Sequence, residues 1–257
     1  MVGLAAGAVK TEDLLRWDFL IFGLYFLFPA NLLIYGINDV FDFETDRRNP
    51  KKSEYEMLVR PESHRPLLVW IAFLNIPFIV AAYVLAPQAI PSLAGFIFFS
   101  VFYSAPPIRA KAISIVDSTF NVLYVFPGAF AFQMITGSFP PVSIIIAGGL
   151  WTAAMHAFSA VPDIDSDRAA RVSTIATFLG RTGTLIFCMA AYLCSAVLGF
   201  PFLGWIGIAT GLTYFGIMLF AIFAPSNDKL FAIYRIFPVI NAAVGFALFW
   251  YVALKFI

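Results

Sequence analysis

Residues 17–46 read WDFLIFGLYFLFPANLLIYGINDVFDFETD, an apolar run that passes directly into a cluster of acidic residues. The apolar part is about as long as the ~20 residues that a helix needs to cross a bilayer. Within the cluster, Asp39, Asp42 and Asp46 stand at positions i, i+3 and i+7, and Asn38 stands four residues before Asp42. Residues at these spacings share one face of a helix, so the stretch predicts a membrane helix with several oxygen atoms at its end.

A second acidic cluster, DIDSD at residues 163–167, follows another apolar run, and its Asp163 and Asp167 stand at i and i+4. Carboxylate and amide oxygens are hard ligands that suit Mg²⁺, which usually binds through one or two carboxylates together with substrate phosphates and water. The two clusters therefore predict an Mg²⁺ site and a substrate that carries a diphosphate. The predicted metal ligands are Asn38, Asp39, Asp42, Asp46, Asp163 and Asp167.

The composition places this chemistry in a membrane. The chain is 61% hydrophobic and only 12% charged, with a mean hydropathy of +0.88, and so much apolar surface cannot be buried in one soluble core. A formal net charge of +1 and the lack of a basic stripe give no indication of nucleic-acid binding. The two cysteines, Cys188 and Cys194, lie six residues apart in one apolar run, which predicts buried thiols and neither a disulfide nor a zinc site.

The apolar runs predict an all-α bundle of about eight membrane-spanning helices, at about 17–37, 66–86, 89–105, 118–136, 140–161, 182–200, 203–223 and 231–254. Most of the 16 Lys and Arg residues fall in the loops of one side, and such loops usually face the cytoplasm. Both acidic clusters fall on that same side. We therefore expect a multi-pass protein of the cell membrane whose active site faces the cytoplasm.

The pattern Asn38-Asp39-x-x-Asp42-x-x-x-Asp46, followed by Asp163-x-x-x-Asp167, resembles the UbiA-type superfamily of intramembrane prenyltransferases. Two further stretches match the superfamily: YSAPPIRAK at residues 103–111, and Ser173-Thr174 with Leu179-Gly180. Residues 35–42, 103–111, 117–124 and 156–163 look most like the lycopene elongases of fifty-carbon carotenoid biosynthesis. The resemblance covers nearly the whole chain.

This resemblance implies a single prenyltransferase domain over residues 1–257, an allylic diphosphate donor, Mg²⁺ and a lipophilic acceptor taken from the lipid, such as lycopene. It assigns catalysis to Asp39, Asp42, Asp46, Asp163 and Asp167, diphosphate binding to Arg109, Lys111 and Arg171, and substrate binding to Tyr103, Ser104 and His156. The family usually has nine helices, whereas only about sixteen residues precede Trp17. We therefore expect the first helix of the family to be missing from this sequence, or the protein to manage with eight.

Several alternatives stay open. Acidic residues can simply mark the solvated end of a helix, Arg109 and Lys111 can be anchors on the basic side, and His156 can be a packing residue. The acceptor can also be the aromatic precursor of a quinone or haem. The scarcity of Arg and Lys within the spans favours an apolar acceptor over one with a carboxylate. A third hypothesis is a transporter that binds a coupling cation, but its sites would usually lie at the middle of the membrane in repeated halves.

Overall fold

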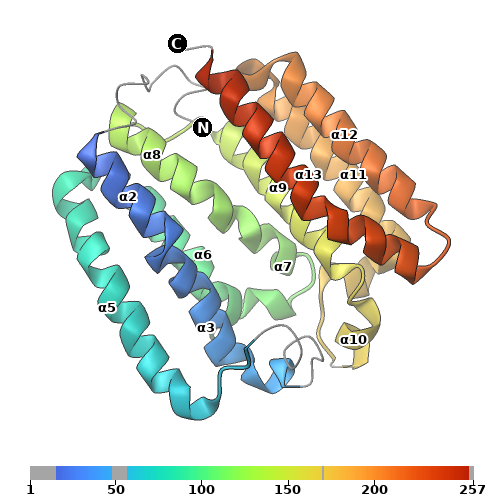
Figure 1. Cartoon of the computed structure of the whole chain (residues 1–257), viewed down its shortest axis with the longest axis horizontal. Coiled ribbons are helices and arrows are strands. Elements are labelled where there is room, and N and C mark those ends of the chain that lie inside the picture. The colour runs from blue at the N-terminus through green and yellow to red at the C-terminus, as the bar shows by residue number, and fades with distance from the viewer. Residues whose placement is uncertain (1–15, 48–56, 170, 255–257) are drawn as a thin grey trace.

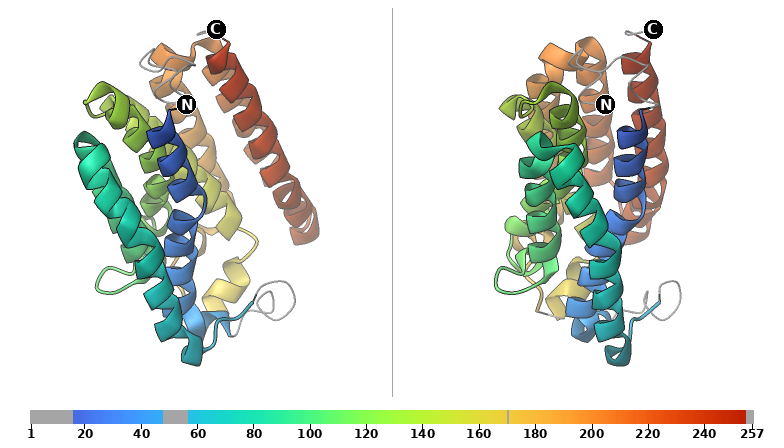
Figure 2. Two further views of the ribbon diagram at one scale, coloured as in Figure 1. Left: turned by 60° about the vertical axis from the view of Figure 1, so that its left-hand side comes forward. Right: turned by 90° about the vertical axis from the view of Figure 1, so that its left-hand side faces the viewer.

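The computed structural model describes residues 16–47, 57–169 and 171–254, and within these ranges the chain forms helices and no strands. The elements are α2 (Trp17–Leu27), α3 (Pro29–Asp46), α5 (Pro61–Leu85), η2 (Pro87–Ala89), α6 (Ile90–Ser104), η3 (Ala110–Ala112), α7 (Val116–Thr119), η4 (Phe120–Val125), α8 (Phe126–Thr136), α9 (Val142–Ala160), α10 (Ile164–Ala169), α11 (Ile175–Leu203), α12 (Trp205–Ile222) and α13 (Asn227–Ala253). The long helices run side by side in nearly the same direction (Figures 1 and 2).

The membrane-spanning bundle expected from the apolar runs is confirmed. Among the described residues, seven helical segments are long and apolar enough to cross a bilayer: Trp17–Glu44, Pro61–Leu85, Val116–Thr136, Val142–Ala160, Ile175–Leu203, Trp205–Ile222 and Lys229–Val252. The eighth predicted span, 89–105, corresponds to α6, which has only 15 residues. The structure is a multi-pass bundle with lipid-facing side chains such as Trp70 and Phe73, which are more than half exposed.

Two breaks in the helices have local causes. The first span divides into α2 and α3 at Pro29, which has no N–H to donate to the preceding turn. The side-chain amide of Asn75, from α5, donates to the carbonyl oxygen of Pro29 at 3.0 Å, and the amide of Asn31 donates to that of Leu27 at 2.9 Å. Polar side chains near the break thus donate to backbone oxygens, so they keep partners in an apolar surrounding. Pro127 similarly marks the change from η4 to α8.

The helices pack as two groups, each with its own aromatic core (Figure 1). In the first group, α2, α3, α5, α6 and α8 enclose Phe22, Tyr25, Phe96 and Phe130. In the second, α9, α11, α12 and α13 enclose a further aromatic cluster that includes Tyr192 and Tyr214, whose ring centroids lie 4.9 Å apart. The segment α7–η4 packs against α9 and joins the two groups.

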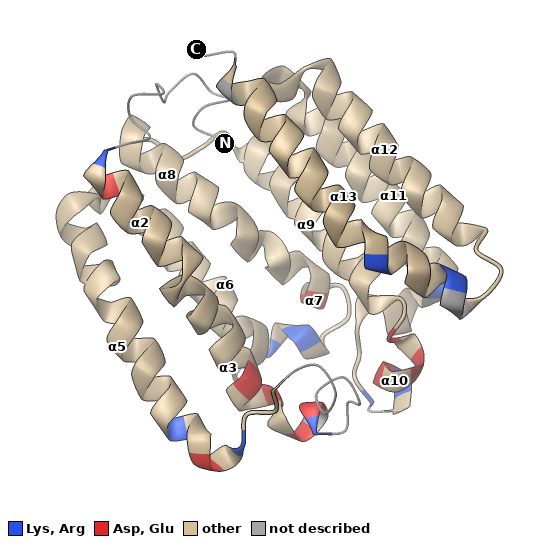
Figure 3. Cartoon of the chain, in the orientation of Figure 1, with Lys and Arg blue, Asp and Glu red and all other residues tan. Residues whose placement is uncertain are grey.

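Charged side chains gather at one end of this bundle, at the end of α3, the start of α5, the region of η3 and α7, and α10 (Figure 3). We call this end the polar end and define it by residues 38–47, 105–117 and 161–174. Both acidic clusters of the sequence lie there, as predicted. A third break, at Gly180 with a φ of 67°, separates the start of α11 from its long remainder. There Arg181 donates to the carbonyl oxygens of Ala221 and Ala224, at 3.1 and 2.6 Å, and fastens the end of α12.

The contact between α11 and α12 depends on a glycine. A Cβ atom on Gly211 would lie 2.5 Å from the Cβ of Ala196 and 3.2 Å from the backbone oxygen of Tyr192. Small residues allow such close helix approach inside membranes. We expect Gly211→Ala to force the two helices apart and to cost about 1–3 kcal/mol, the usual effect of overpacking.

The measurement is the thermal unfolding midpoint of the purified protein in detergent, with Gly216→Ala as the matched control. Gly216 lies on the same helix, and a Cβ added there meets nothing within 4 Å. The control should be neutral or slightly stabilising, because Ala favours helices over Gly. Equal midpoints for the two variants would contradict the close packing at Gly211.

Candidate active site

The centre of the polar end is Asp42, whose side chain is fully buried at the last turns of α3. The ammonium group of Lys111 forms an ion pair with Asp42 Oδ2, and a guanidinium nitrogen of Arg109 lies 3.8 Å from Oδ1. Ser104, at the end of α6, donates to Oδ2 at 3.3 Å. A buried carboxylate is tolerated only with such partners. The structure thus brings the first acidic cluster and the predicted diphosphate-binding residues together.

Asn38 completes this group. Its side-chain amide donates to the hydroxyl oxygen of Ser104 at 2.9 Å, which leaves its own carbonyl oxygen as an acceptor or metal ligand. Asn38 and Asp42 are one turn apart on α3, so both contact Ser104 from the same face. Asp39 and Asp46 lie on α3 as well and are half-buried. The helical spacing predicted for this cluster is therefore confirmed.

The loop of residues 105–115, between α6 and α7, is held in a tight conformation. Arg109 and Ile115 have φ values of 47° and 75°, in the left-handed region that non-glycine residues seldom adopt. The N–H of Arg109 donates to the carbonyl of Ala105 at 3.0 Å, and that of Asp117 donates to Ile113 at 2.9 Å. Such conformations persist where the surrounding structure imposes them, often at functional sites.

This loop also connects the two acidic clusters. The hydroxyls of Ser114 and Ser173 lie 3.0 Å apart, and Ser114 donates to the carbonyl of Thr174 at 3.2 Å. Thr174 caps α11 and its hydroxyl lies 3.5 Å from a carboxylate oxygen of Asp167. Contacts therefore run from Asp42 through Lys111 and the loop to the second acidic cluster.

The second cluster occupies the turn before α10 and α10 itself. The N–H of Asp167 donates to the carbonyl of Asp163 at 2.8 Å, so the two residues are one helical turn apart, and both side chains are half-buried. Arg171 lies just beyond α10, exposed to solvent, with a φ of 56°. Arg48, Lys51 and Lys52 of the predicted basic side lie outside the described residues.

The donor set suits a hard divalent cation, although the carboxylates are not drawn together. Within the described ranges, no three His, Cys, Asp or Glu side chains lie close enough to hold one ion. However, Asp42 Oδ1 is buried and accepts no hydrogen bond from any described residue. Such an orphaned carboxylate oxygen fits a metal ligand, and Mg²⁺ commonly takes its remaining ligands from phosphate and water.

One buried polar group has no predicted role. Asp117 lies at the start of α7, is fully buried, and accepts the backbone N–H of Ile175 at 3.0 Å through Oδ2. The ring nitrogen Nε2 of His156 is 3.8 Å from the same oxygen and 3.4 Å from the hydroxyl of Tyr103. Ionisable residues within apolar spans are functional by default, and this signal in the sequence could have found Asp117.

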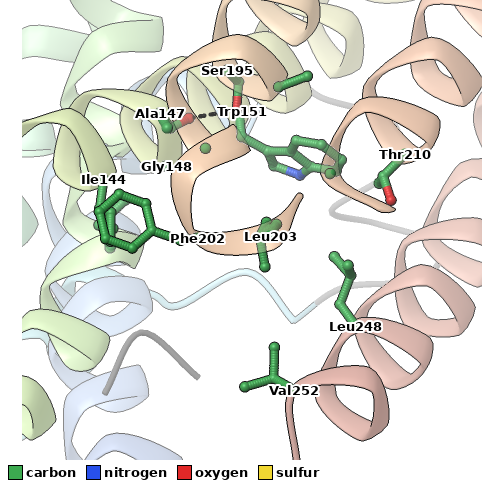
Figure 4. Close-up of a pocket in the computed structure, with 14 residues that line it drawn as sticks. Ile144, Ala147, Gly148, Trp151, Ser195, Phe202, Leu203, Thr210, Leu248 and Val252 are labelled. Atoms are coloured by element: carbon green, nitrogen blue, oxygen red, sulfur yellow. Dashed lines mark hydrogen bonds between the residues drawn. The ribbon is translucent and has the colours of Figure 1, made fainter. Parts of the chain in front are cut away.

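An apolar pocket of about 240 Å³ lies between α9, α11, α12 and α13, in the half of the bundle away from the polar end (Figure 4). Its lining includes Trp151 and Phe202, and Ser195 uses its hydroxyl to donate to the backbone of Ala147 at 2.8 Å. Trp151 precedes His156 by five residues on α9, which corresponds to about 7.5 Å along the helix axis. The pocket can hold part of an apolar molecule.

The family model described as "UbiA prenyltransferase family" matches residues 1–231. The chain belongs to this family. A lycopene elongase/hydratase of Halobacterium salinarum is 37% identical over 255 residues, which cover 99% of this chain and 86% of the relative. A lycopene elongase/hydratase of Haloferax volcanii is 39% identical over 246 residues, covering 95% and 80%.

Solved structures agree with the UbiA fold. The chain superimposes on a UbiA homolog from Archaeoglobus fulgidus bound to GPP and Mg²⁺ with a TM-score of 0.68 at 20% identity, over 96% of this chain and 93% of the homolog. The resemblance to UbiA-type proteins, and within them to lycopene elongases, is therefore confirmed. The UbiA-family chain is a multi-pass membrane prenyltransferase.

The ion pair between Lys111 and Asp42, at the centre of this UbiA-family site, predicts how substitutions of these two residues change the stability of the protein. Lys111→Met removes the charge but keeps the length of the side chain, and it leaves Asp42 buried without its main partner. Such a change costs about 3–5 kcal/mol. The double variant Lys111→Met with Asp42→Asn removes the uncompensated charge as well, so we expect it to unfold at a higher temperature than Lys111→Met alone.

The exposed pair Arg47–Glu44, three residues apart at the end of α3, supplies the control. Arg47→Met should change stability by no more than about 1 kcal/mol, as is usual for surface ion pairs. Thermal unfolding in detergent measures all three variants. A double variant no more stable than Lys111→Met would show that Lys111 does not compensate Asp42.

Proposed function

We propose that this prenyltransferase transfers a dimethylallyl group from its diphosphate to lycopene, in an Mg²⁺-dependent reaction of carotenoid biosynthesis. The observation that carries the proposal is the buried Asp42 with Lys111 and Arg109 beside it, at the polar end of an otherwise apolar bundle. This group provides a carboxylate ligand for a metal and cationic side chains for phosphate oxygens. It lies next to an apolar interior. We also propose that the whole chain acts as one domain.

In the proposed reaction, the site has to stabilise the negative charge of the departing diphosphate. Asn38, Asp39, Asp42, Asp46, Asp163 and Asp167 would hold Mg²⁺, which supplies neutralisation of the charge that develops on the leaving group. Lys111 lies in η3 and Arg109 directly precedes it, in the loop after α6, where their cations can contact diphosphate oxygens. Arg171, exposed beyond α10, is placed to add a further cation from the second cluster.

The apolar interior determines what happens to the carbon chain. When the allylic C–O bond breaks, its electron pair leaves with the diphosphate and an allylic cation remains. The terminal double bond of the acceptor then attacks this cation and forms the new C–C bond. Packed apolar side chains around the acceptor exclude the bulk water that would otherwise intercept the cation.

Two observations favour lycopene over an aromatic acid as the acceptor. The relatives quoted above are named lycopene elongase/hydratase. In addition, the pocket beyond His156 is lined almost entirely by apolar side chains and includes no Lys or Arg, so it offers nothing to neutralise a carboxylate. We infer that a long hydrocarbon lies along α9, with one end at the polar end and the remainder toward this pocket.

The proposed orientation follows from the charges of the loops. Most of the described Lys and Arg residues lie in the polar end or in neighbouring segments, the start of α5 and the start of α13 among them (Figure 3). Basic loops usually remain on the cytoplasmic side during insertion. We therefore propose that the polar end faces the cytoplasm, from which a soluble diphosphate donor can reach it.

Expression in a lycopene-making bacterium tests the acceptor. The wild-type protein should convert lycopene into pigments that are heavier by one or two five-carbon units, with or without water, as measured by mass spectrometry of the extracted carotenoids. Asp42→Asn, present in the membrane in equal amount, should leave lycopene unchanged. Unaltered lycopene beside the wild-type protein, combined with prenylation of 4-hydroxybenzoate by the same membranes, would replace lycopene with an aromatic acceptor.

A second prediction concerns the metal and the second acidic cluster. Isolated membranes should lose prenyl transfer in EDTA and regain it with Mg²⁺. Asp163→Asn should lower the rate by orders of magnitude, since metal stabilisation is worth several kcal/mol and each ~1.4 kcal/mol is tenfold. Asp165→Asn is the matched control, because Asp165 lies in the same turn but points to solvent as an exposed residue. Undiminished turnover in Asp163→Asn would remove the second cluster from the site.

A further inference from the structure

A polar group beside the diphosphate site takes no part in binding the leaving group. Asp117 is fully buried, and its Oδ1 atom accepts no hydrogen bond from the part of the chain that the structure describes. Its Oδ2 atom accepts the N–H of Ile175, in the first turn of α11. A buried carboxylate oxygen with no partner is costly, so an unpaired Oδ1 indicates a ligand or water that is not part of the chain.

His156 faces this carboxylate across a gap. Its Nε2 atom is 3.8 Å from Asp117 Oδ2, which is too long for a direct hydrogen bond, and a water molecule can bridge two polar groups that do not bond directly. The same Nε2 is 3.4 Å from the hydroxyl of Tyr103, and the two rings meet edge to face at 6.0 Å. Three polar side chains from α6, α7 and α9 therefore converge, which is enough to hold one ordered water.

This position lies between the proposed diphosphate site and the apolar pocket. Tyr103 is followed in the chain by Ser104, which donates to Asp42 in the diphosphate site. In the other direction, α9 leads from His156 to Trp151 in the apolar pocket. A carbon atom that has just joined the allylic group at the polar end, with its hydrocarbon tail toward the pocket, would therefore lie near Nε2.

We propose that Tyr103, Asp117 and His156 hold the water molecule that adds to the acceptor after prenyl transfer. This inference rests on the proposed function and deepens it, because it assigns the fate of the second cation. Attack by the terminal double bond forms the C–C bond and leaves a tertiary cation on the acceptor. The water oxygen forms a C–O bond to this cation, one O–H bond of the water breaks, and the proton passes to His156 Nε2. The product is a tertiary alcohol.

The three side chains have different parts in this step. His156 is the catalytic residue, because a neutral imidazole accepts a proton through one nitrogen. Asp117 is a positioning residue that orients the water and stabilises the imidazolium as it forms, while Tyr103 holds the imidazole from the other side. Without the water, the tertiary cation loses a proton from a neighbouring carbon and becomes an alkene. The group therefore decides between alcohol and alkene.

The ratio of hydroxylated to dehydrated products tests this assignment, since a purely structural role would lower total conversion without changing the ratio. In lycopene-making cells, the wild-type protein should give mainly the hydroxylated product. His156→Gln should lower the ratio by about a hundredfold, the low end of what a positioned general base contributes, while lycopene is still consumed. Asp117→Asn and Tyr103→Phe should lower it less.

Thr152→Val is the matched control. Thr152 lies one turn before His156 on the same helix, and its hydroxyl donates to the backbone carbonyl of Gly149 at 3.1 Å, so the ratio should stay at the wild-type value. A wild-type ratio in His156→Gln, or a wild-type protein that makes only alkenes, overturns the inference but leaves prenyl transfer intact. If His156→Gln does not accumulate, an unchanged ratio in both Tyr103→Phe and Asp117→Asn overturns it. Unconverted lycopene with wild-type protein overturns the proposed function as well.

Discussion

A carboxylate buried at the end of an apolar bundle is the constraint on which the polar end depends. Asp42 is inaccessible to water, so its charge has to be compensated by groups that the chain brings to it. Lys111 and Arg109 meet this need, and both come from the loop of residues 105–115. The ion pair therefore holds this loop against α3. The same loop places Ser114 beside Ser173 and leads to Asp117, which accepts the N–H of Ile175 in α11.

In the apolar part of the protein, uncharged polar groups also need partners within the chain. Where a spanning helix is interrupted or ends, a polar side chain from a neighbouring helix donates to backbone carbonyl oxygens there, as Asn75 does at Pro29 and Arg181 does at the end of α12. Polar residues within the spans are thus mostly committed to backbone groups. Asp117 and Asp42 differ, because each keeps a buried carboxylate oxygen without a hydrogen bond among the described residues. These two atoms are where a ligand would complete the structure.

The sequence predicted the features that depend on short-range patterns. Apolar length alone located the spanning helices, and the i, i+4 spacing placed Asn38 and Asp42 on one face of α3. The sequence could mark Asp117 as an ionisable residue beside an apolar span, but it could not identify its partners. Ile175 is 58 residues away in the chain, and the contact with His156 requires α7 and α9 to pack together. Nor could the sequence predict the left-handed backbone at Arg109 and Ile115, which tertiary contacts impose on residues that do not favour it. Long-range packing, which a local pattern does not contain, accounts for both omissions.

In the proposed reaction, the polar end would stabilise charges of opposite sign in succession, first the departing anion and then a carbocation, and neighbouring residues at the end of α6 contact the two groups that would do so. Ser104 contacts Asp42 on the side of Lys111, whereas Tyr103 contacts His156 on the side of Asp117. Successive residues of a helix point about 100° apart, because a turn holds 3.6 residues, so two neighbours in sequence can face two different compartments. In the proposed reaction, a cation formed near His156 would therefore meet a different set of side chains from the departing diphosphate. The same apolar bundle would then exclude bulk water from the first cation and admit a single water to the second.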